Sequence, residues 1–124
     1  MTLLLDTHVF LWWRLDSRRL TRPVRNAIAT ADVVWVSAAS AWEVAIKQHL
    51  GKIQLEDSFA SMVEGSDFHP LPITLAHADR TADLPPHHMD PFDRMLIAQA
   101  ITEGATFVTH DRGCEPYDVP ILWT

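Results

Sequence analysis

An α/β fold, with a mainly parallel sheet between two layers of helices, is the architecture that this sequence predicts. Three observations lead to it: short runs of branched and aromatic apolar residues, longer segments of helical periodicity, and a regular alternation of the two. Parallel strands need crossover connections, and the helices in those crossovers cover the faces of the sheet. The predicted class is therefore a three-layer α/β/α sandwich.

Size and composition agree with one domain spanning residues 1–124. The chain is 48% hydrophobic and 21% charged, which is ordinary for a domain of about 100–150 residues and too apolar for a disordered chain. Its one cysteine, Cys114, excludes an intrachain disulfide and favours a reducing compartment. No apolar run approaches the roughly 18 residues of a membrane span, and no basic region precedes residues 1–5. We therefore expect a soluble, cytoplasmic protein without a signal peptide or membrane segment.

The first half of the chain is predicted to form two strands and three helices. Thr2–Leu5 is aliphatic and Val33–Ser37 is β-branched and aromatic, so both are predicted to be buried strands. Helices are predicted at Val9–Leu15, Arg22–Ala31 and Ala41–Leu50.

Two of these helices carry end signals. Thr21 is the predicted N-cap of the second helix, and Pro23 stands in its first turn. The third helix has the clearest pattern, with Gly51 at the position that ends a helix. Its apolar residues form one stripe at helical spacing: Trp42, Ala45, Ile46, His49 and Leu50.

The second half continues the alternation. Helices are predicted at Ser58–Gly65, at Leu75–Leu84 before a pair of prolines, and at Pro91–Glu103 before Gly104. The last of these is almost entirely apolar after its first turn, so it is expected to be buried. Strands are predicted at His69–Ile73, where two prolines weaken the pattern, and at Thr106–Thr109 and Val119–Trp123.

Acidic residues fall where predicted strands end or the following helices begin. Asp6 follows the first strand, Glu43 opens the helix after the second, Asp93 opens the buried late helix, and Asp111 follows Thr106–Thr109. In an open α/β sheet, ligands bind at the carboxyl ends of the strands. We therefore expect the four carboxylates to converge on one crevice.

Each of these residues also has an ordinary structural interpretation. Ser40 and Glu43 match a capping box, and Glu43 could pair with Lys47 one turn later. Asp90 has the position of an N-cap before a proline, and strand-ending aspartates are common in turns.

Four carboxylates in one crevice repel each other, and a hard divalent cation such as Mg²⁺ removes that cost. A zinc site is not expected, because Cys114 stands alone and the pair His87-His88 lacks spaced partners.

The sequence resembles the PIN-domain ribonucleases, in particular the VapC-type toxins of toxin–antitoxin pairs. Five segments, spread over the whole chain, carry the resemblance: LLLDTHVFLW at 3–12, SAASAWEVAIK at 37–47, DPFDRMLIAQA at 90–100, FVTHD at 107–111 and VPILW at 119–123.

The resemblance implies a PIN-like fold and an endoribonuclease dependent on Mg²⁺, with Mn²⁺ as a substitute. The catalytic and metal-binding residues that it implies are Asp6, Glu43, Asp93 and Asp111. One or two metals would activate a water for in-line attack on a phosphodiester and leave a 5′-phosphate and a 3′-hydroxyl. Residues that would support the metal or contact substrate are Thr7, Ser40, Asp90, Arg94, Thr109 and Arg112. Met89 stands where this subgroup commonly has arginine.

The resemblance also implies partners. The net charge is −6, but metal would cancel several of the acids, and basic residues could contact the RNA backbone. A basic cluster lies in Arg14–Arg25. The implied assembly is a homodimer bound to a small VapB-type antitoxin. The Trp-rich helix Val9–Leu15 is apolar on more than one face, so we expect part of it to contact a partner.

Two alternatives remain open on the sequence. The first is a PIN nuclease of RNA processing or DNA ends without an antitoxin. The second is a non-enzymatic, Mg²⁺-binding receiver-like module. Such a module needs an aspartate after its third strand and a late lysine, whereas His69–Ile73 has no aspartate and no lysine follows Lys52.

Overall fold

A five-stranded, entirely parallel sheet forms the centre of the protein. The computed structural model describes every residue except Met89, and its strands lie in the order β3-β2-β1-β4-β5. All four neighbouring pairs are parallel. The strands are β1 Thr2–Leu5, β2 Val33–Ser37, β3 His69–Leu71, β4 Thr106–Thr109 and β5 Ile121–Trp123.

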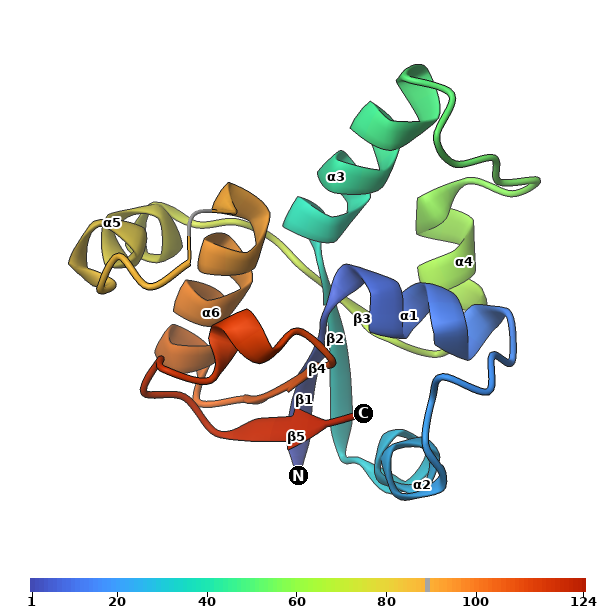
Figure 1. The fold of residues 1–124 in the computed structure, drawn as a ribbon. Coiled ribbons are helices and arrows are strands. Elements are labelled where there is room, and N and C mark those ends of the chain that lie inside the picture. Colours follow the sequence, from blue (N-terminus) through green and yellow to red (C-terminus); the bar gives the residue numbers. More distant parts are fainter. Residues whose placement is uncertain (89) are drawn as a thin grey trace.

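Helices cover both faces of this sheet, as Figure 1 shows, with α1, α2 and α4 on one side and α5 and α6 on the other. Each side has its own hydrophobic core, one around Phe10 and one around Phe107. The predicted three-layer α/β/α class is confirmed. The helices are α1 Thr7–Arg14, α2 Arg22–Thr30, α3 Ala38–His49, α4 Phe59–Gly65, α5 Leu75–Asp83, α6 Pro91–Glu103 and the short 3₁₀ helix η1 Arg112–Cys114.

The predicted elements are all present, and several boundaries differ. The first and third helices begin directly after the strands that precede them, at Thr7 and Ala38. The predicted strand at His69–Ile73 ends at Leu71, and the last strand begins only at Ile121, after Pro120. Proline lacks the N–H that a ladder needs, which limits strands at these points. The helix η1 was not predicted.

The apolar stripe of α3 is not its buried face. Trp42 is 62% exposed and Leu50 is 59% exposed, whereas Glu43 and Val44 are buried. The amino-terminal half of α3 packs between α1 and α6 at the end of the sheet, so the face that carries Glu43 is the one enclosed. Hydrophobic periodicity identified the helix correctly, but the apolar stripe does not mark the face that packs inward.

The segment Val9–Leu15 is buried at its start and exposed at its end, where Leu15 is 76% exposed, and contact of this part with a partner stays a prediction. Val9 and Phe10 are fully buried, and Trp12 and Trp13 are partly buried against the same core. The large exposed apolar side chains include Trp42 and Leu50 of α3 and Leu75 at the start of α5. In the part of the chain that the model describes, no helix is long and apolar enough to cross a membrane.

Candidate active site

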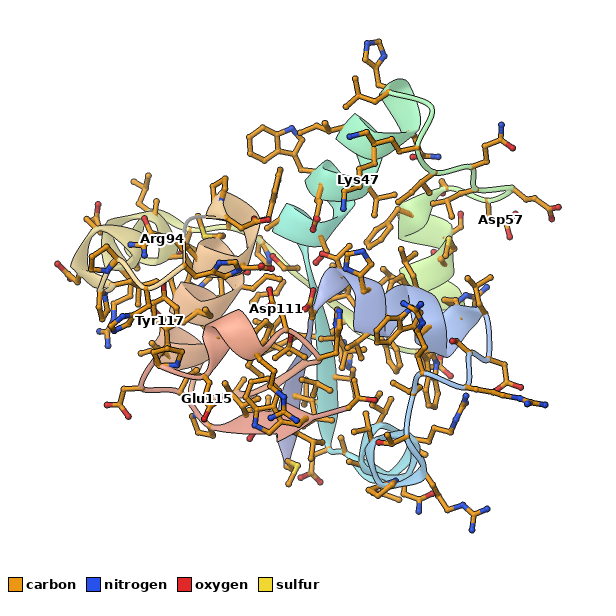
Figure 2. All side chains as sticks on the ribbon, in the orientation of Figure 1. Lys47, Asp57, Arg94, Asp111, Glu115 and Tyr117 are labelled. Atoms are coloured by element: carbon orange, nitrogen blue, oxygen red, sulfur yellow. The ribbon has the colours of Figure 1, made fainter. Side chains whose placement is uncertain are left out.

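The carboxyl ends of β1, β2 and β4 bring together the segments that carry the four predicted acids. Asp6 directly follows β1, Glu43 lies on α3 after β2, Asp93 lies in the first turn of α6, and Asp111 follows β4 and precedes η1. Because β1 and β4 are neighbouring parallel strands, Asp6 and Asp111 leave the sheet at the same edge. Figure 2 shows Asp111 between α6 and the start of α1.

Asp6 is held by a hydroxyl group from the adjacent strand. The Oγ1 atom of Thr109 donates to Oδ2 of Asp6 at 2.6 Å and accepts from the backbone N–H of Asp111 at 3.0 Å. Asp6 is 4% exposed, and burial raises the pKa of its carboxyl group despite the hydrogen bond from Thr109. Nearby Glu43 raises this pKa further, so Thr109 joins two predicted ligands and Asp6 is electrostatically linked to a third.

Glu43 is enclosed by polar side chains. Its Oε1 atom accepts from Oγ1 of Thr7 at 2.7 Å, and Oγ1 of Thr7 also lies 2.8 Å from Oγ of Ser40. Lys47 donates to Oε2 at 2.9 Å, which confirms the expected pairing one turn apart. The capping-box interpretation is wrong, because α3 begins earlier than predicted and its N-cap is Ser37. Glu43 is therefore free of a capping role.

Asp93 and Asp111 meet at a histidine. The Nε2 atom of His88 lies 2.8 Å from Oδ2 of Asp93 and 3.1 Å from Oδ2 of Asp111. Burial and the nearby charge of Asp6 raise the pKa of Asp93 to about 7. Burial lowers the pKa of His88, but the two aspartates outweigh it and the net shift is upward. Burial raises the pKa of Asp111, whereas the backbone N–H of Gly113 and the charge of His88 lower it, and the net shift is downward.

Asp90 is the N-cap of α6. Its Oδ1 atom accepts from the backbone N–H groups of Phe92 at 2.8 Å and Asp93 at 3.2 Å, so the capping interpretation is confirmed. The cap orients the first turn of α6, from which Asp93 projects. The expectation that concerned Met89 lies outside the described residues.

Arg94 is occupied by the chain itself. Its guanidinium donates to the backbone oxygens of Thr81 and Leu84 at 2.9 and 3.1 Å, and to that of Pro85 at 2.8 Å. It also donates to the hydroxyl of Tyr117 at 3.1 Å, and Figure 2 shows Arg94 and Tyr117 on the same side of the molecule. These bonds anchor the segment that leads to His88, and a contact of Arg94 with substrate stays a prediction.

His88 is the residue that the sequence interpretation missed. The sequence pattern tests it only as a zinc ligand with spaced partners, although it stands five residues before Asp93. The available signal is a histidine pair two residues before the N-cap of a helix with an acidic first turn. The ring could be placed only once the hydroxyl of Tyr117, which accepts from the backbone N–H of His88 at 2.8 Å, fixed the loop.

The chemistry of the donors fits a hard divalent cation. The acids are oxygen donors, and burial together with a neighbouring acid raises the pKa values of Asp6 and Asp93, a cost that a bound cation would reduce. Among the described residues, three different ligand-bearing side chains approach within 4.8 Å of one another at His88, Asp111 and Cys114. Of the four predicted acids, Asp111 belongs to this group.

Comparison with known proteins identifies the family to which this chain belongs. The model of the PIN domain family matches residues 3–119. The chain is 36% identical over 114 residues to Ribonuclease VapC22 of Mycobacterium tuberculosis, a match that covers 90% of this chain and 88% of that protein.

Solved structures agree at the level of the fold. A chain of the DNA-bound VapBC2 structure from Rickettsia felis superposes with a TM-score of 0.72 at 12% identity, covering 98% of both chains. A chain of the DNA-bound VapBC structure from Salmonella typhimurium gives 0.68 at 18% identity, covering 98% of this chain and 97% of that one. The protein belongs to the PIN-domain family of nucleases and, among its members, is similar to the VapC ribonucleases.

Proposed function

We propose that this nuclease is the toxin of a VapBC-type toxin–antitoxin pair and cleaves RNA with the help of Mg²⁺ or Mn²⁺. The proposal is supported by the places of Asp6, Glu43, Asp93 and Asp111 in the fold, each after a parallel strand or in the amino-terminal half of a helix, in a PIN domain whose relative is a ribonuclease. These four residues would hold the cation.

The side chains around the acids would keep them ready for a cation and a substrate. Thr109 holds Asp6, while Thr7 and Lys47 hold Glu43, so these two carboxylates keep their orientation. A bound divalent cation supplies activation of the attacking water and compensation of charge on the phosphate. Asp93 and Asp111 would then direct their Oδ2 atoms into the crevice, where they now meet His88.

Exposed cations near the crevice would bind the RNA backbone. Arg112 is exposed, directly follows Asp111, and stacks on Trp123 with 4.2 Å between its guanidinium carbon and the ring centre. Stacking positions the group without using up its N–H donors. Arg25, by contrast, donates to Asp16 at 2.7 Å and to Leu20, so the Arg14–Arg25 cluster contributes less than its charge count implies.

A second copy of the chain would cover the exposed face of α3. Trp42 packs edge-on against Phe92 with 5.4 Å between ring centres, and both line an apolar groove of about 580 Å³ between α3 and α6. A second apolar groove, of about 530 Å³, lies between α3 and α4 and includes Phe59 and Phe68. We assign the first groove to a homodimer and the second to a VapB-type antitoxin, since a solved structure of similar fold from Klebsiella pneumoniae is a toxin–antitoxin complex and each groove offers an apolar surface for one partner.

The nuclease proposal is tested by incubating the purified protein with total cellular RNA and either Mg²⁺ or EDTA, then mapping the cut ends. We expect cleavage in Mg²⁺ that EDTA abolishes and that Asp6→Asn removes. Full cleavage in EDTA would contradict the metal-dependent mechanism.

The toxin role is tested separately by expression in a bacterial host. Wild-type protein should arrest growth, Asp6→Asn at equal abundance should not, and co-expression of the antitoxin should restore growth. Normal growth with wild-type protein would favour the alternative of a PIN nuclease in RNA processing, with the nuclease activity itself intact.

The homodimer is tested by replacing Trp42 with arginine and measuring mass by light scattering. Wild type should have the mass of a dimer and the variant that of a monomer, with Ile73→Ala as a milder change in the same groove. A monomeric wild-type protein would overturn the assignment of this face.

A further inference from the structure

The model gathers a second kind of ligand set beside the carboxylates. The side chains of His88, Asp111 and Cys114 each offer one ligand atom, and these atoms all lie within 4.8 Å of one another. An imidazole nitrogen, a thiol sulfur and a carboxylate oxygen are the donors that Zn²⁺ takes in proteins, whereas Mg²⁺ does not take sulfur.

We propose that His88, Asp111 and Cys114 form an inhibitory site for Zn²⁺ that competes with the catalytic cation for Asp111. Zinc binding here would make Asp111 unavailable to the catalytic cation. It would also place the positive charge of the zinc ion next to Asp93. The inhibition rests on the proposed nuclease function, whereas the binding of zinc does not.

The distances are close to those that zinc requires. Ligand atoms around a tetrahedral zinc ion lie about 3.3–3.8 Å apart, given bonds of about 2.0–2.3 Å. Nε2 of His88 and Oδ2 of Asp111 are 3.1 Å apart, and one ligand atom from each of His88, Asp111 and Cys114 lies within 4.8 Å of the other two. Small side-chain rotations would therefore close the triangle, with water or Asp93 as a fourth ligand.

Two features of the backbone hold this arrangement. Oδ1 of Asp111 accepts from the backbone N–H of Gly113 at 2.9 Å, which leaves Oδ2 directed at His88. Gly113 also provides the space, because a Cβ atom there would lie 3.1 Å from Oδ1 of Asp111 and 3.6 Å from the ring of His88. A side chain at residue 113 would crowd Asp111 and touch the ring of His88 at ordinary contact distance.

The site has an inner and an outer side. Cys114 is fully buried, while the side chains of His88 and Asp111 are 23% and 36% exposed. A metal ion would enter past the histidine and the carboxylate and reach the thiol last. Coordination to sulfur releases the thiol proton to solvent, so the bound thiolate and carboxylate balance the two charges of the ion.

Direct binding is measured with Co²⁺ as a spectroscopic stand-in for Zn²⁺, in a phosphine reductant and without Mg²⁺. We expect wild-type protein to show a thiolate-to-cobalt charge-transfer band that Zn²⁺ abolishes by displacement. Cys114→Ala should lose the band, and His88→Gln should weaken binding at least about tenfold. Gly113→Ala should weaken it less, and Glu115→Gln, an exposed acid next to the cysteine, is the control that should leave it unchanged.

Inhibition is measured as RNA cleavage at fixed Mg²⁺ with rising Zn²⁺. Cys114→Ala should cleave RNA like wild type without zinc and need at least about tenfold more zinc for half-inhibition. Circular dichroism in EDTA checks that each variant is folded, and Cys114→Ser serves if the alanine variant is not. A wild-type protein without the charge-transfer band, or equal zinc sensitivity of wild type and Cys114→Ala, would overturn the site. Absence of cleavage in Mg²⁺ alone would instead overturn the nuclease proposal, with the cobalt result still valid.

Discussion

The four acids of the candidate site form two pairs that are held in different ways: the first half is Asp6 with Glu43, and the second half is Asp93 with Asp111. Asp6 and Glu43 accept hydrogen bonds from Thr109, Thr7 and Lys47, all on regular strands and helices. Asp93 and Asp111 share the ring of His88, which stands in the irregular segment between α5 and α6. The first half keeps its geometry through donors that are part of the fold, and the second depends on a group that a cation could replace.

The two halves should therefore differ in how strongly they respond to ligands and to solution conditions. Donors on packed elements cost little to keep in place, so the first half is organised before any ligand arrives. The two aspartates raise the pKa of His88, and the protonated ring supplies positive charge where a divalent cation would otherwise do so. We therefore expect metal, pH and substitution to act mainly on the half that contains Asp93 and Asp111.

Loss of one carboxylate from either half should have the largest effect. Asp6→Asn and Asp93→Asn should each lower RNA cleavage at least about a hundredfold, because each removes a charged ligand from the proposed metal site. Initial rates on a defined RNA at saturating Mg²⁺ measure this. Asp90→Asn is the matched control, since asparagine also caps helices. A rate within a few-fold of wild type for Asp93→Asn would remove Asp93 from the site.

Removal of the hydroxyl that joins the halves should destabilise the fold. Thr109 donates to buried Asp6 and accepts from the backbone of Asp111, so the isosteric change Thr109→Val leaves both groups without this partner. We expect a loss of about 1–3 kcal/mol in the free energy of unfolding, measured by urea denaturation. Thr106→Val, on the same strand but only partly buried, should change it much less. Equal losses of unfolding free energy in the two variants would show that the effect comes from replacing any threonine of β4 and not from the hydrogen bonds of Thr109.

The pH dependence of stability should reveal the half around His88. The pKa of Asp93 rises to about 7 and that of His88 is also raised, so the folded state holds more protons than the unfolded state between about pH 4 and the raised pKa values of the folded state. In EDTA, the melting temperature should therefore fall as pH rises from 5 to 8. Asp93→Asn should flatten this slope, and a slope as steep as that of wild type would contradict the assignment.

Mg²⁺ should raise the melting temperature of wild type, because it binds the folded site and not the scattered acids of the unfolded chain. Asp93→Asn should gain less from Mg²⁺ than wild type does. An equal gain in the two proteins would place Asp93 outside the metal site.

Substitution of Lys47 should have the smallest effect on stability. Its bond to Glu43 is partly exposed, with 31% of the lysine side chain accessible, and such pairs contribute about 0–1 kcal/mol. Lys47→Met should change the free energy of unfolding by less than about 1 kcal/mol in urea denaturation. A larger loss would mean that Glu43 depends on lysine more than on Thr7.

The sequence was sufficient for the fold and for the position of the predicted ligands. Strand and helix patterns such as Val33–Ser37 and Pro91–Glu103 are strong local signals, and their bounds match the structure. Asp90 as N-cap was also local information, because the cap and its N–H partners are two and three residues apart. Parallel order then places the strand ends, and with them Asp6 and Asp111, at a common edge.

Only the tertiary structure decided which faces pack and which side chains meet. The apolar stripe of α3 includes Trp42, which is exposed, whereas the face that carries Glu43 is enclosed by contacts with α1 and α6. His88 reaches Asp111, 23 residues away, only because Tyr117 and Arg94 hold its loop. Hydrophobic periodicity reports local backbone geometry. Which helix face packs inward and which side chains meet depend on contacts between segments far apart in the sequence, and these contacts produce no periodic pattern.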